Sequence, residues 1–264
     1  AGSTSYDVTP ELRTELSGSY DILRYDNEDV ADRNDYDIWV GGVSLDHVMT
    51  PESTIGIEGR WTSADYDWES QPIIAPDGTI VDSGDAARNS EGYQVGVSYR
   101  NSFSSKLVGS LRAGYEMKDF DASYADDATQ PYGSADLTML PTARTRVNLG
   151  ASYSLYEADI YPYTNQVRTA VYGSVGYDIT PKIDVFASAL MTSGEYDADE
   201  AVTTVTEGAL QDGDDDAMQF VMRARYNVIR NQYVELGWQH TTLDSDLRPD
   251  YDRNRVWVGW QARM

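Results

Sequence analysis

The sequence predicts an all-β protein, specifically a transmembrane, antiparallel, up-and-down β-barrel of about twelve strands. Three observations lead to this fold. Apolar and polar residues alternate along most of the chain, the connections between the predicted strands alternate between short and long, and the long connections are strongly acidic. Alternation with a period of two sends successive side chains to opposite faces of a sheet. Two faces of opposite polarity, with turns that are short at one end and long at the other, are typical of outer-membrane barrels.

The alternation is clearest in "TRVNLGASYSL" at 145–155, where Val147 and Leu149 fall on one face and Arg146 and Asn148 on the other. The same pattern, bounded by turn residues, predicts strands along the whole chain. These strands lie at 11–25, 36–48, 54–66, 92–100, 106–119, 134–140, 145–157, 166–179, 183–196, 217–228, 232–243 and 253–264. Both faces of 36–48 are apolar, so we expect a β-bulge there.

The lengths of the connections distinguish the two ends of the predicted sheet. Short turns are expected at 49–54, 101–105, 141–144, 180–182 and 229–231, and long segments at 26–35, 67–91, 120–133, 158–165, 197–216 and 244–252. Residues 197–216 contain no basic residue. One end is therefore tight and periplasmic, and the other is extracellular and anionic. The chain is expected to be a single domain over 1–264, with a periplasmic N-terminal segment at 1–10 and both termini periplasmic.

Composition excludes several classes of protein. With a formal net charge of -24, the chain is a poor partner for nucleic acid. With no Cys, it has neither disulfides nor thiolate chemistry. No stretch approaches the roughly 18–20 apolar residues of a transmembrane helix. A soluble β-sandwich or β-solenoid stays open as an alternative. Arg and Glu opposite Gly and Ser, long strands, and Tyr and Trp near strand ends favour the membrane barrel.

The polar face gathers more than half of the basic residues. An Arg on the lipid face costs about 2–4 kcal/mol near the bilayer midplane, so these residues are expected to face the lumen. The predicted lumen and solute-binding residues are Arg60, Arg100, Arg112, Lys118, Arg146, Arg168, Arg223, Arg225, Arg253 and Arg255. Two interpretations stay open. Either Arg–Glu pairs fill a narrow barrel, or an excess of Arg leaves a positive lumen that passes an anionic solute.

Other sites are weaker. The "DGDDD" segment at 212–216 could take Ca²⁺, but its spacing is not that of an EF-hand loop, and a solvated run of charge explains it more simply. His240 lies near Asp244, Ser245 and Asp246, which leaves a hydrolase at the outer rim as a third hypothesis. No second catalytic group has a diagnostic spacing. No P-loop, dinucleotide fingerprint or metal-ligand spacing occurs, so no cofactor is expected.

Three segments of the second half carry a family resemblance: "PTARTRVNLGASYSLYEAD" (141–159), "YTNQVRTAVYGSVGYDITPKIDVFASALMTSGEYD" (163–197) and "YVELGWQHTTLDSDLRPDYDRNRVWVGW" (233–260). They share an Arg-rich strand start and a Gly-Tyr strand end before a Thr-Pro turn, and the tail contains Tyr-Asp-Arg-Asn-Arg-Val. In these features the chain resembles the β-barrel porins found with bacterial exopolysaccharide secretion genes, although members of that family are expected to be larger. The resemblance implies an outer-membrane exit for an exopolysaccharide, working with a periplasmic export protein. It brings no catalytic residues.

The leading functional prediction is thus an outer-membrane pore, surrounded by lipid and lipopolysaccharide, for an anionic saccharide or polysaccharide. The alternative is a structural or interaction barrel with a closed lumen, whose acidic loops bind a partner.

Overall fold

The computed structural model describes residues 1–24, 35–66, 73–74, 80–82, 89–121, 127–158, 163, 165–196, 212–229 and 232–262. Within them, one 13-stranded sheet follows the order of the chain, and a separate two-stranded hairpin lies outside it. No helix long and apolar enough to cross a membrane occurs in this part of the chain. The strands of the large sheet are β1 (Gly2–Thr9), β2 (Leu12–Leu23), β3 (Tyr36–Thr50), β4 (Ser53–Tyr66), β7 (Ser90–Ser104), β8 (Leu107–Phe120), β9 (Ala128–Thr142), β10 (Thr145–Glu157), β11 (Asn165–Thr180), β12 (Ile183–Tyr196), β13 (Gly213–Ile229), β14 (Gln232–Ser245) and β15 (Tyr251–Ala262). The small hairpin is β5 (Ile73–Ile74) and β6 (Ile80–Asp82).

The all-β, antiparallel, up-and-down architecture is confirmed, and each of the twelve predicted strands corresponds to an observed one. The thirteenth strand, β1, lies in the segment expected to precede the barrel, and it pairs with β2 from Gly2 opposite Gly18. The start of the chain therefore lies beside the middle of β2 rather than at the short-turn end. Strands β9 and β13 also begin earlier than predicted, because Pro131 and the acidic residues of 212–216 resemble loop sequence.

The bulge expected within 36–48 was wrong. The register of β3 is continuous from Tyr36 to His47 against β2 and from Tyr36 to Val48 against β4, and it shifts only between Val48 and Thr50 at the turn. The strand is apolar on both faces for another reason. Its inward Ile38 is paired with Ala64, which is buried, so apolar side chains cover this part of the inner wall as well.

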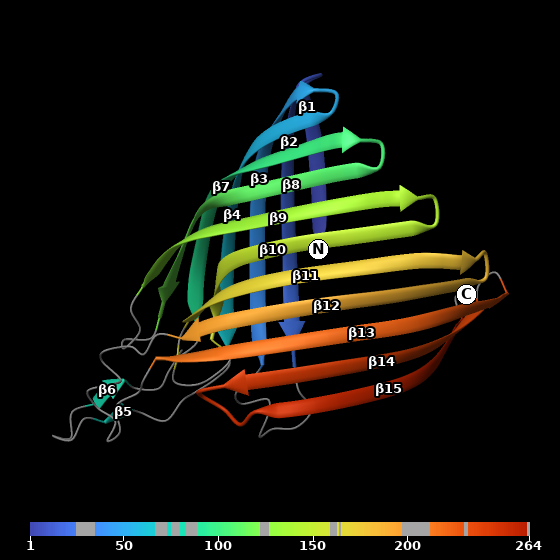
Figure 1. The fold of residues 1–264 in the computed structure, drawn as a ribbon. Helices are drawn as coiled ribbons and strands as arrows, with labels where there is room; N and C mark the ends of the chain where they lie inside the picture. Colours follow the sequence, from blue (N-terminus) through green and yellow to red (C-terminus); the bar gives the residue numbers. More distant parts are fainter. Residues whose placement is uncertain are drawn as a thin grey trace.

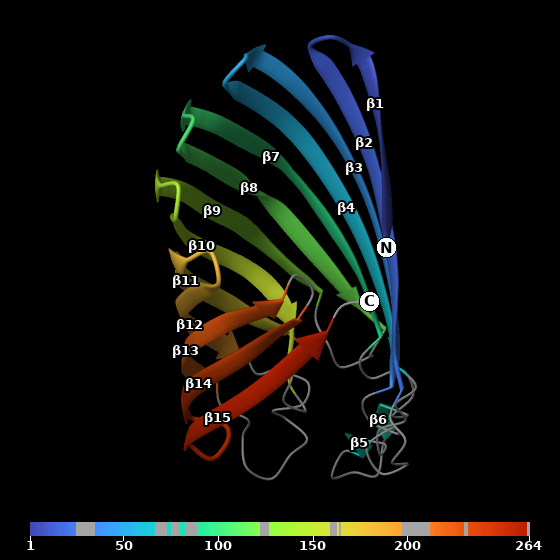
Figure 2. The ribbon, with the colours of Figure 1, turned by 90° about the vertical axis from the view of Figure 1, so that its right-hand side faces the viewer.

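The sheet is strongly curved, and its first and last strands do not meet (Figures 1 and 2). Tight turns at 10–11, 51–52, 105–106, 143–144 and 181–182 lie at one end of the strands, and the longer connections leave from the other. Strands β1 and β15 both run toward the short-turn end. Direct pairing between them would therefore be parallel, whereas every pairing within the sheet is antiparallel.

The pairing register aligns side chains in rows that run across successive strands. Arg100, Ser110, Asp136, Gly150 and Tyr172 are successive direct partners from β7 to β11. Directly paired residues of antiparallel strands point to the same face of a sheet. All members of such a row therefore share one face, and the residues between them share the other.

Candidate functional site

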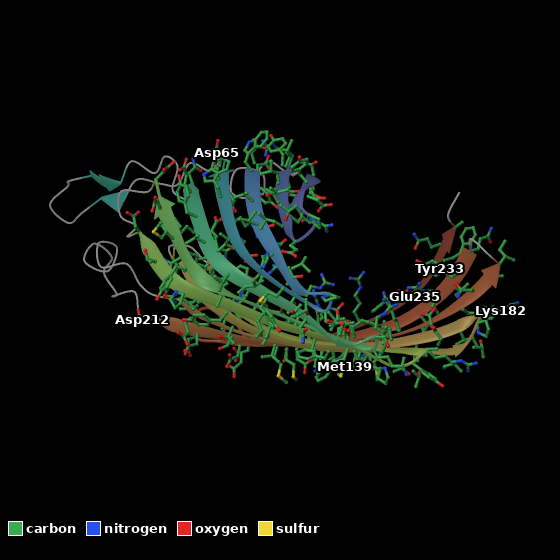
Figure 3. The ribbon with its side chains drawn as sticks, turned by 90° about the horizontal axis from the view of Figure 1, so that it is seen from above. Asp65, Met139, Lys182, Asp212, Tyr233 and Glu235 are labelled. Atoms are coloured by element: carbon green, nitrogen blue, oxygen red, sulfur yellow. The ribbon has the colours of Figure 1, made fainter. Side chains whose placement is uncertain are left out.

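The convex face of the sheet is apolar. Figure 3 shows Met139 on this side and Glu235 on the concave side. The large exposed apolar residues of the convex face include Val95, Leu111, Val258 and Trp260, and two hollows of about 690 and 470 Å³ on it are lined mainly by apolar side chains. A face of this composition is stable when it contacts lipid. In water, the same face would expose an extensive apolar area at a cost in free energy.

At the long-connection end the convex face becomes acidic. Carboxylates stand directly opposite one another across four strand pairs: Asp37 and Asp65, Glu91 and Asp119, Glu195 and Asp214, and Asp216 and Asp244. Like charges in direct opposition are destabilising, and far more so in a medium of low dielectric constant. This band therefore lies outside the hydrocarbon layer and marks the polar boundary at that end.

All ten basic residues predicted for the lumen share the opposite, concave face. Their strand partners establish this without exception, since each pairs into rows that contain the inward Ser, Gly, Gln and Glu residues. Their neighbours, however, divide them into residues that are held by polar or aromatic partners and residues that are not.

Arg60, Arg100, Arg146, Arg253 and Arg255 are exposed, and among the described residues they have no ion pair and no side-chain hydrogen bond. Arg112 pairs with Glu58 at 3.6 Å and Lys118 pairs with Glu157 at 3.8 Å. The guanidinium of Arg168 donates to Oε1 of Gln166 at 3.0 Å. The sheet thus contains both of the arrangements that the sequence left open, paired charges and unpaired arginines.

On the concave face, the described residues of strands β12–β15 include four arginines and three carboxylates. Arg225 lies 3.9 Å from Asp184 and 3.7 Å from Glu235, so it takes up both carboxylates. Arg223 has no ion pair in the described structure, and its guanidinium stacks over the Phe186 ring at 4.4 Å. Together with Arg253 and Arg255 it forms a group of three arginines without acidic partners, which we call the C-terminal arginine group.

The concave side of the N-terminal strands is a mixture of charges. A hollow of about 600 Å³ is lined in part by Glu15, Glu58, Arg60 and Arg112. A second hollow of about 490 Å³, nearer the short turns, shares Glu15, Glu58 and Arg112 and adds Arg13, Asp46 and Arg100. Acids and bases thus alternate along this wall.

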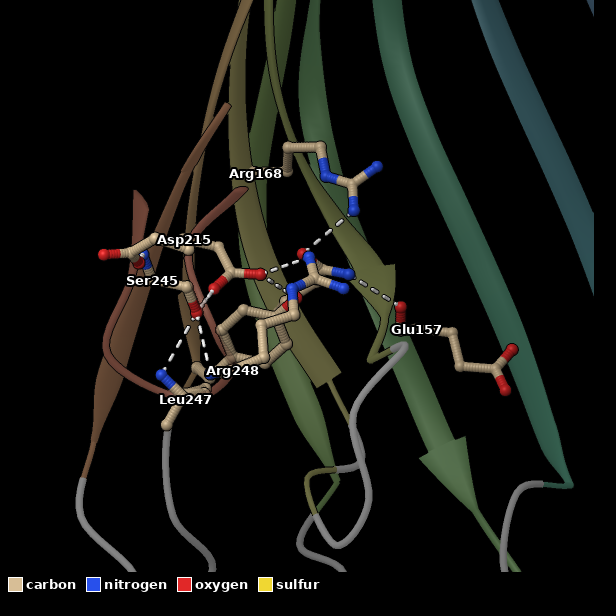
Figure 4. Close-up of polar contacts among 9 residues, drawn as sticks. Glu157, Arg168, Asp215, Ser245, Leu247 and Arg248 are labelled. Carbon is tan, nitrogen blue, oxygen red and sulfur yellow. Dashed lines mark hydrogen bonds and ion pairs between the residues drawn. The ribbon is translucent and has the colours of Figure 1, made fainter. Parts of the chain in front are cut away.

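A buried polar network lies at the long-connection end of the concave face (Figure 4). The Asp215 carboxylate, only 6% exposed, accepts hydrogen bonds from Ser245, Arg248 and, at 3.4 Å, the Tyr196 hydroxyl. The backbone amides of Leu247 and Arg248 each donate to the Ser245 hydroxyl at 3.1 Å. These contacts fold the connection between β14 and β15 inward over β13.

The same network explains why Arg168 is held in place. Gln166, 1% exposed, accepts from Arg168 and donates to the backbone oxygen of Glu157 at 3.1 Å. Beside it, Tyr163 packs edge-on against Tyr196 with ring centroids 5.5 Å apart. Burial and the nearby Asp212 carboxylate raise the pKa of the Tyr163 hydroxyl above its usual value, so this group stays neutral.

The segment considered for Ca²⁺ does not converge on one point. Asp215 faces inward into the network, whereas Asp214 and Asp216 pair with Glu195 and Asp244 on the convex face. Alternation along β13 therefore separates these carboxylates onto opposite sides of the sheet. Among the residues that the structure describes, no group of three or more His, Cys, Asp or Glu could hold a metal ion.

Comparison with known proteins agrees with this geometry. Residues 11–264 match the model of the family described as "Putative beta-barrel porin 2". The chain belongs to this family of β-barrel porins. Porins are channels of the outer membrane, so this is also the location of the chain. The matched residues include all twelve strands from β2 to β15 of the large sheet and leave out β1.

Solved structures share the fold at low identity. The outer-membrane channel DcaP of Acinetobacter baumannii is 12% identical with a TM-score of 0.56, over 93% of this chain and 70% of that one. The FrpB iron transporter from Neisseria meningitidis is 12% identical with a TM-score of 0.53, over 91% of this chain and 41% of that one. The chain thus spans under half of the FrpB transporter's length. No curated protein matches the chain.

The porin family gives no support to a rim hydrolase, and of the groups considered with His240, Ser245 is out of its reach, although Oδ1 of Asp252 lies 3.4 Å from the His240 Nδ1. His240 belongs to the convex face, where it stacks on Trp238 with centroids 5.9 Å apart and lies 3.2 Å from Oδ1 of Asn254. Ser245 belongs to the concave face, where it is bonded to Asp215. The two side chains are separated by the sheet and cannot act together.

Sequence reasoning missed three aromatic residues of the concave face as site residues. Tyr132, Tyr172 and Trp257 each cover a glycine on the neighbouring strand and donate to a carboxylate, Glu58, Asp136 and Glu235 respectively. The glycines, Gly114, Gly150 and Gly237, are the direct strand partners of these rings. An inward-facing aromatic residue aligned with an inward-facing glycine is the signal that could have revealed them, but it requires the register.

Proposed function

We propose that the chain forms an outer-membrane channel whose arginine-rich concave wall favours anions and serves the passage or export of an anionic saccharide or exopolysaccharide. One observation supports this most directly. Arg223, Arg253 and Arg255 face the concave side without an acidic partner among the described residues, while the two carboxylates near them are taken up by Arg225. Rings of Arg and Lys favour anions in pores, and the planar guanidinium suits carboxylates.

The orientation and the partners belong to the same proposal. The short turns face the periplasm, where an export protein can deliver the polymer, and the acidic band meets the lipopolysaccharide headgroups. The network around Asp215 supports an ordered wall at the outer end, because Ser245 and Arg248 hold the connection between β14 and β15 against β13.

A closed structural barrel is the second candidate, and specific contacts favour it. Arg225 pairs with Glu235 at 3.7 Å and Arg112 with Glu58 at 3.6 Å, as an Arg–Glu ladder filling the lumen would require. In that case the acidic outer connections would bind a partner instead.

Conductance distinguishes the two candidates. The refolded chain is inserted into a planar lipid bilayer under a KCl gradient. The channel proposal predicts discrete conductance steps. It also predicts a reversal potential whose sign indicates that chloride passes more readily than potassium. Inserted protein without conductance would favour the closed barrel, and a preference for potassium would contradict the positive wall.

A further inference from the structure

One part of the concave wall combines aromatic faces with unpaired guanidinium groups. Phe186, Arg223, Gly237 and Trp257 are successive direct partners across β12–β15, so they form a single row on the concave face. Because Gly237 has no side chain, the Trp257 ring lies over it, in the space that a Cβ would need. In this row Arg223 therefore lies between Phe186 and the Trp257 ring, and its guanidinium lies over Phe186.

Both rings are held in position. The Trp257 indole N–H donates to Oε1 of Glu235 at 3.0 Å, and Glu235 is itself held 3.7 Å from Arg225. Arg223 stacks on Phe186 at 4.4 Å, and its Nε is buried without a hydrogen-bond partner. The two Nη atoms at the end of the guanidinium are therefore the donors that can reach a ligand. Trp257 is half-buried: one face rests on the glycine and the other is turned to the concave side.

Arginine and amide groups flank this row on its long-connection side. Arg255 and Gln239 are direct partners one row above, and Arg255 is exposed with no ion pair in the part of the chain described. The Gln239 amide donates to the Thr241 hydroxyl at 3.1 Å. Arg223 and Arg255 are two strands and one row apart, which puts their Cα atoms roughly 12 Å from each other. The Trp257 ring lies between them over Gly237, so a ligand on this ring has one guanidinium on each side.

This combination fits one ligand class. The C–H face of a pyranose ring is apolar and packs on an aromatic ring, whereas its hydroxyls need polar groups at the edge. A carboxylate on the sugar needs a planar fork of donors, which Arg supplies and Lys does not. We propose that Trp257, Phe186, Arg223 and Arg255 form a binding subsite for a uronic-acid unit, with the ring on Trp257 and the carboxylate between the two arginines.

The inference rests on the proposed function, because it assumes that the concave face is a lumen open to solutes, and it adds the sugar class and the residues that bind it. The opposite face of β15 supplies a matched control. Trp260 lies on the same strand and faces lipid, with 67% of its surface exposed.

The test measures block of single-channel current in a planar bilayer by tri-galacturonate and by maltotriose, a neutral trisaccharide of the same length. Tri-galacturonate is expected to block at a concentration at least about tenfold lower than maltotriose. Trp257→Leu and Arg223→Gln are each expected to raise the half-blocking concentration of tri-galacturonate about tenfold, and Trp260→Leu to leave it unchanged. Equal block by both sugars, or unchanged block in Arg223→Gln, would overturn the subsite.

The variants and readouts distinguish failure of the subsite from failure of the anion-selective channel. Should Trp257→Leu fail to fold, Arg223→Gln decides, since it keeps both rings and the Glu235 hydrogen bond. Chloride preference with equal block by both sugars refutes the subsite alone. Selective block by tri-galacturonate in a channel without chloride preference supports the subsite and refutes the anion-selective wall.

Discussion

Asp215 and Asp216 are neighbours in strand β13, yet they lie on opposite faces of the sheet in opposite electrostatic settings. Asp215 is buried and bonded to Arg248, Ser245 and Tyr196. Asp216 is exposed and stands directly opposite the carboxylate of Asp244. A stretch that reads as one run of acid in the sequence thus contains one stabilising and one destabilising carboxylate.

Isosteric substitutions at these two positions should therefore change stability in opposite directions. Asp215→Asn is expected to lower the free energy of unfolding by roughly 1–3 kcal/mol, because it removes the charge that Arg248 pairs with. Asp216→Asn is expected to raise it by roughly 0.2–1 kcal/mol, because it relieves repulsion from Asp244. Denaturant unfolding of the refolded protein in detergent micelles measures both. Equal effects of the two substitutions would show that the assignment of faces along β13 is wrong.

Two glycines of the concave face should respond differently to the same change. A Cβ on Gly237 would occupy the place of the Trp257 ring, whereas nothing lies within 4 Å of a Cβ on Gly259. Gly237→Ala is expected to cost about 1–3 kcal/mol through overpacking. Gly259→Ala, its control in the neighbouring strand, should be close to neutral in the same unfolding measurement. A neutral Gly237→Ala would mean that the ring does not rest on the glycine.

The orientation in the outer membrane can be tested on whole cells. Asp65 lies at the long-connection end and Lys182 lies in a short turn at the opposite end (Figure 3). The chain contains no Cys, so single cysteines introduced at these positions are the only thiols. A membrane-impermeant maleimide added outside should label Asp65→Cys and spare Lys182→Cys until the cells are permeabilised. The reverse pattern would place the short turns outside.

Much of the sheet is predictable from the sequence because a barrel wall separates two solvents. Lipid on one side and water on the other force the same alternation on every strand, so parity alone placed Arg60, Arg223 and Arg255 on one face. The strands that were shortened in the prediction contain Pro131 and Asp214, which are typical of loops. Asp214 is tolerated because it lies in the acidic band at the long-connection end, whereas Pro131 pairs with Tyr115 in a row of apolar residues.

The arrangement of the site was less predictable because it depends on register. Nothing in the sequence pairs Trp257 with Gly237 or places Arg223 against Phe186, since these partners are 20 or more residues apart. Arg248 lies in the long segment expected at 244–252, and only the folded connection reveals that it enters the Asp215 network. Pairing also decides which arginines are neutralised, and composition cannot show this.

The central claim is that unpaired arginines on the concave face set the selectivity of a channel. The most direct measurement is the reversal potential under a KCl gradient for the triple variant Arg223→Gln, Arg253→Gln and Arg255→Gln. Its control is Lys106→Gln, Arg144→Gln and Lys182→Gln, which removes the same charge from three short turns. The lumen triple should shift the reversal potential toward potassium while the turn triple leaves it nearly unchanged. An unchanged reversal potential in the lumen triple would contradict the claim.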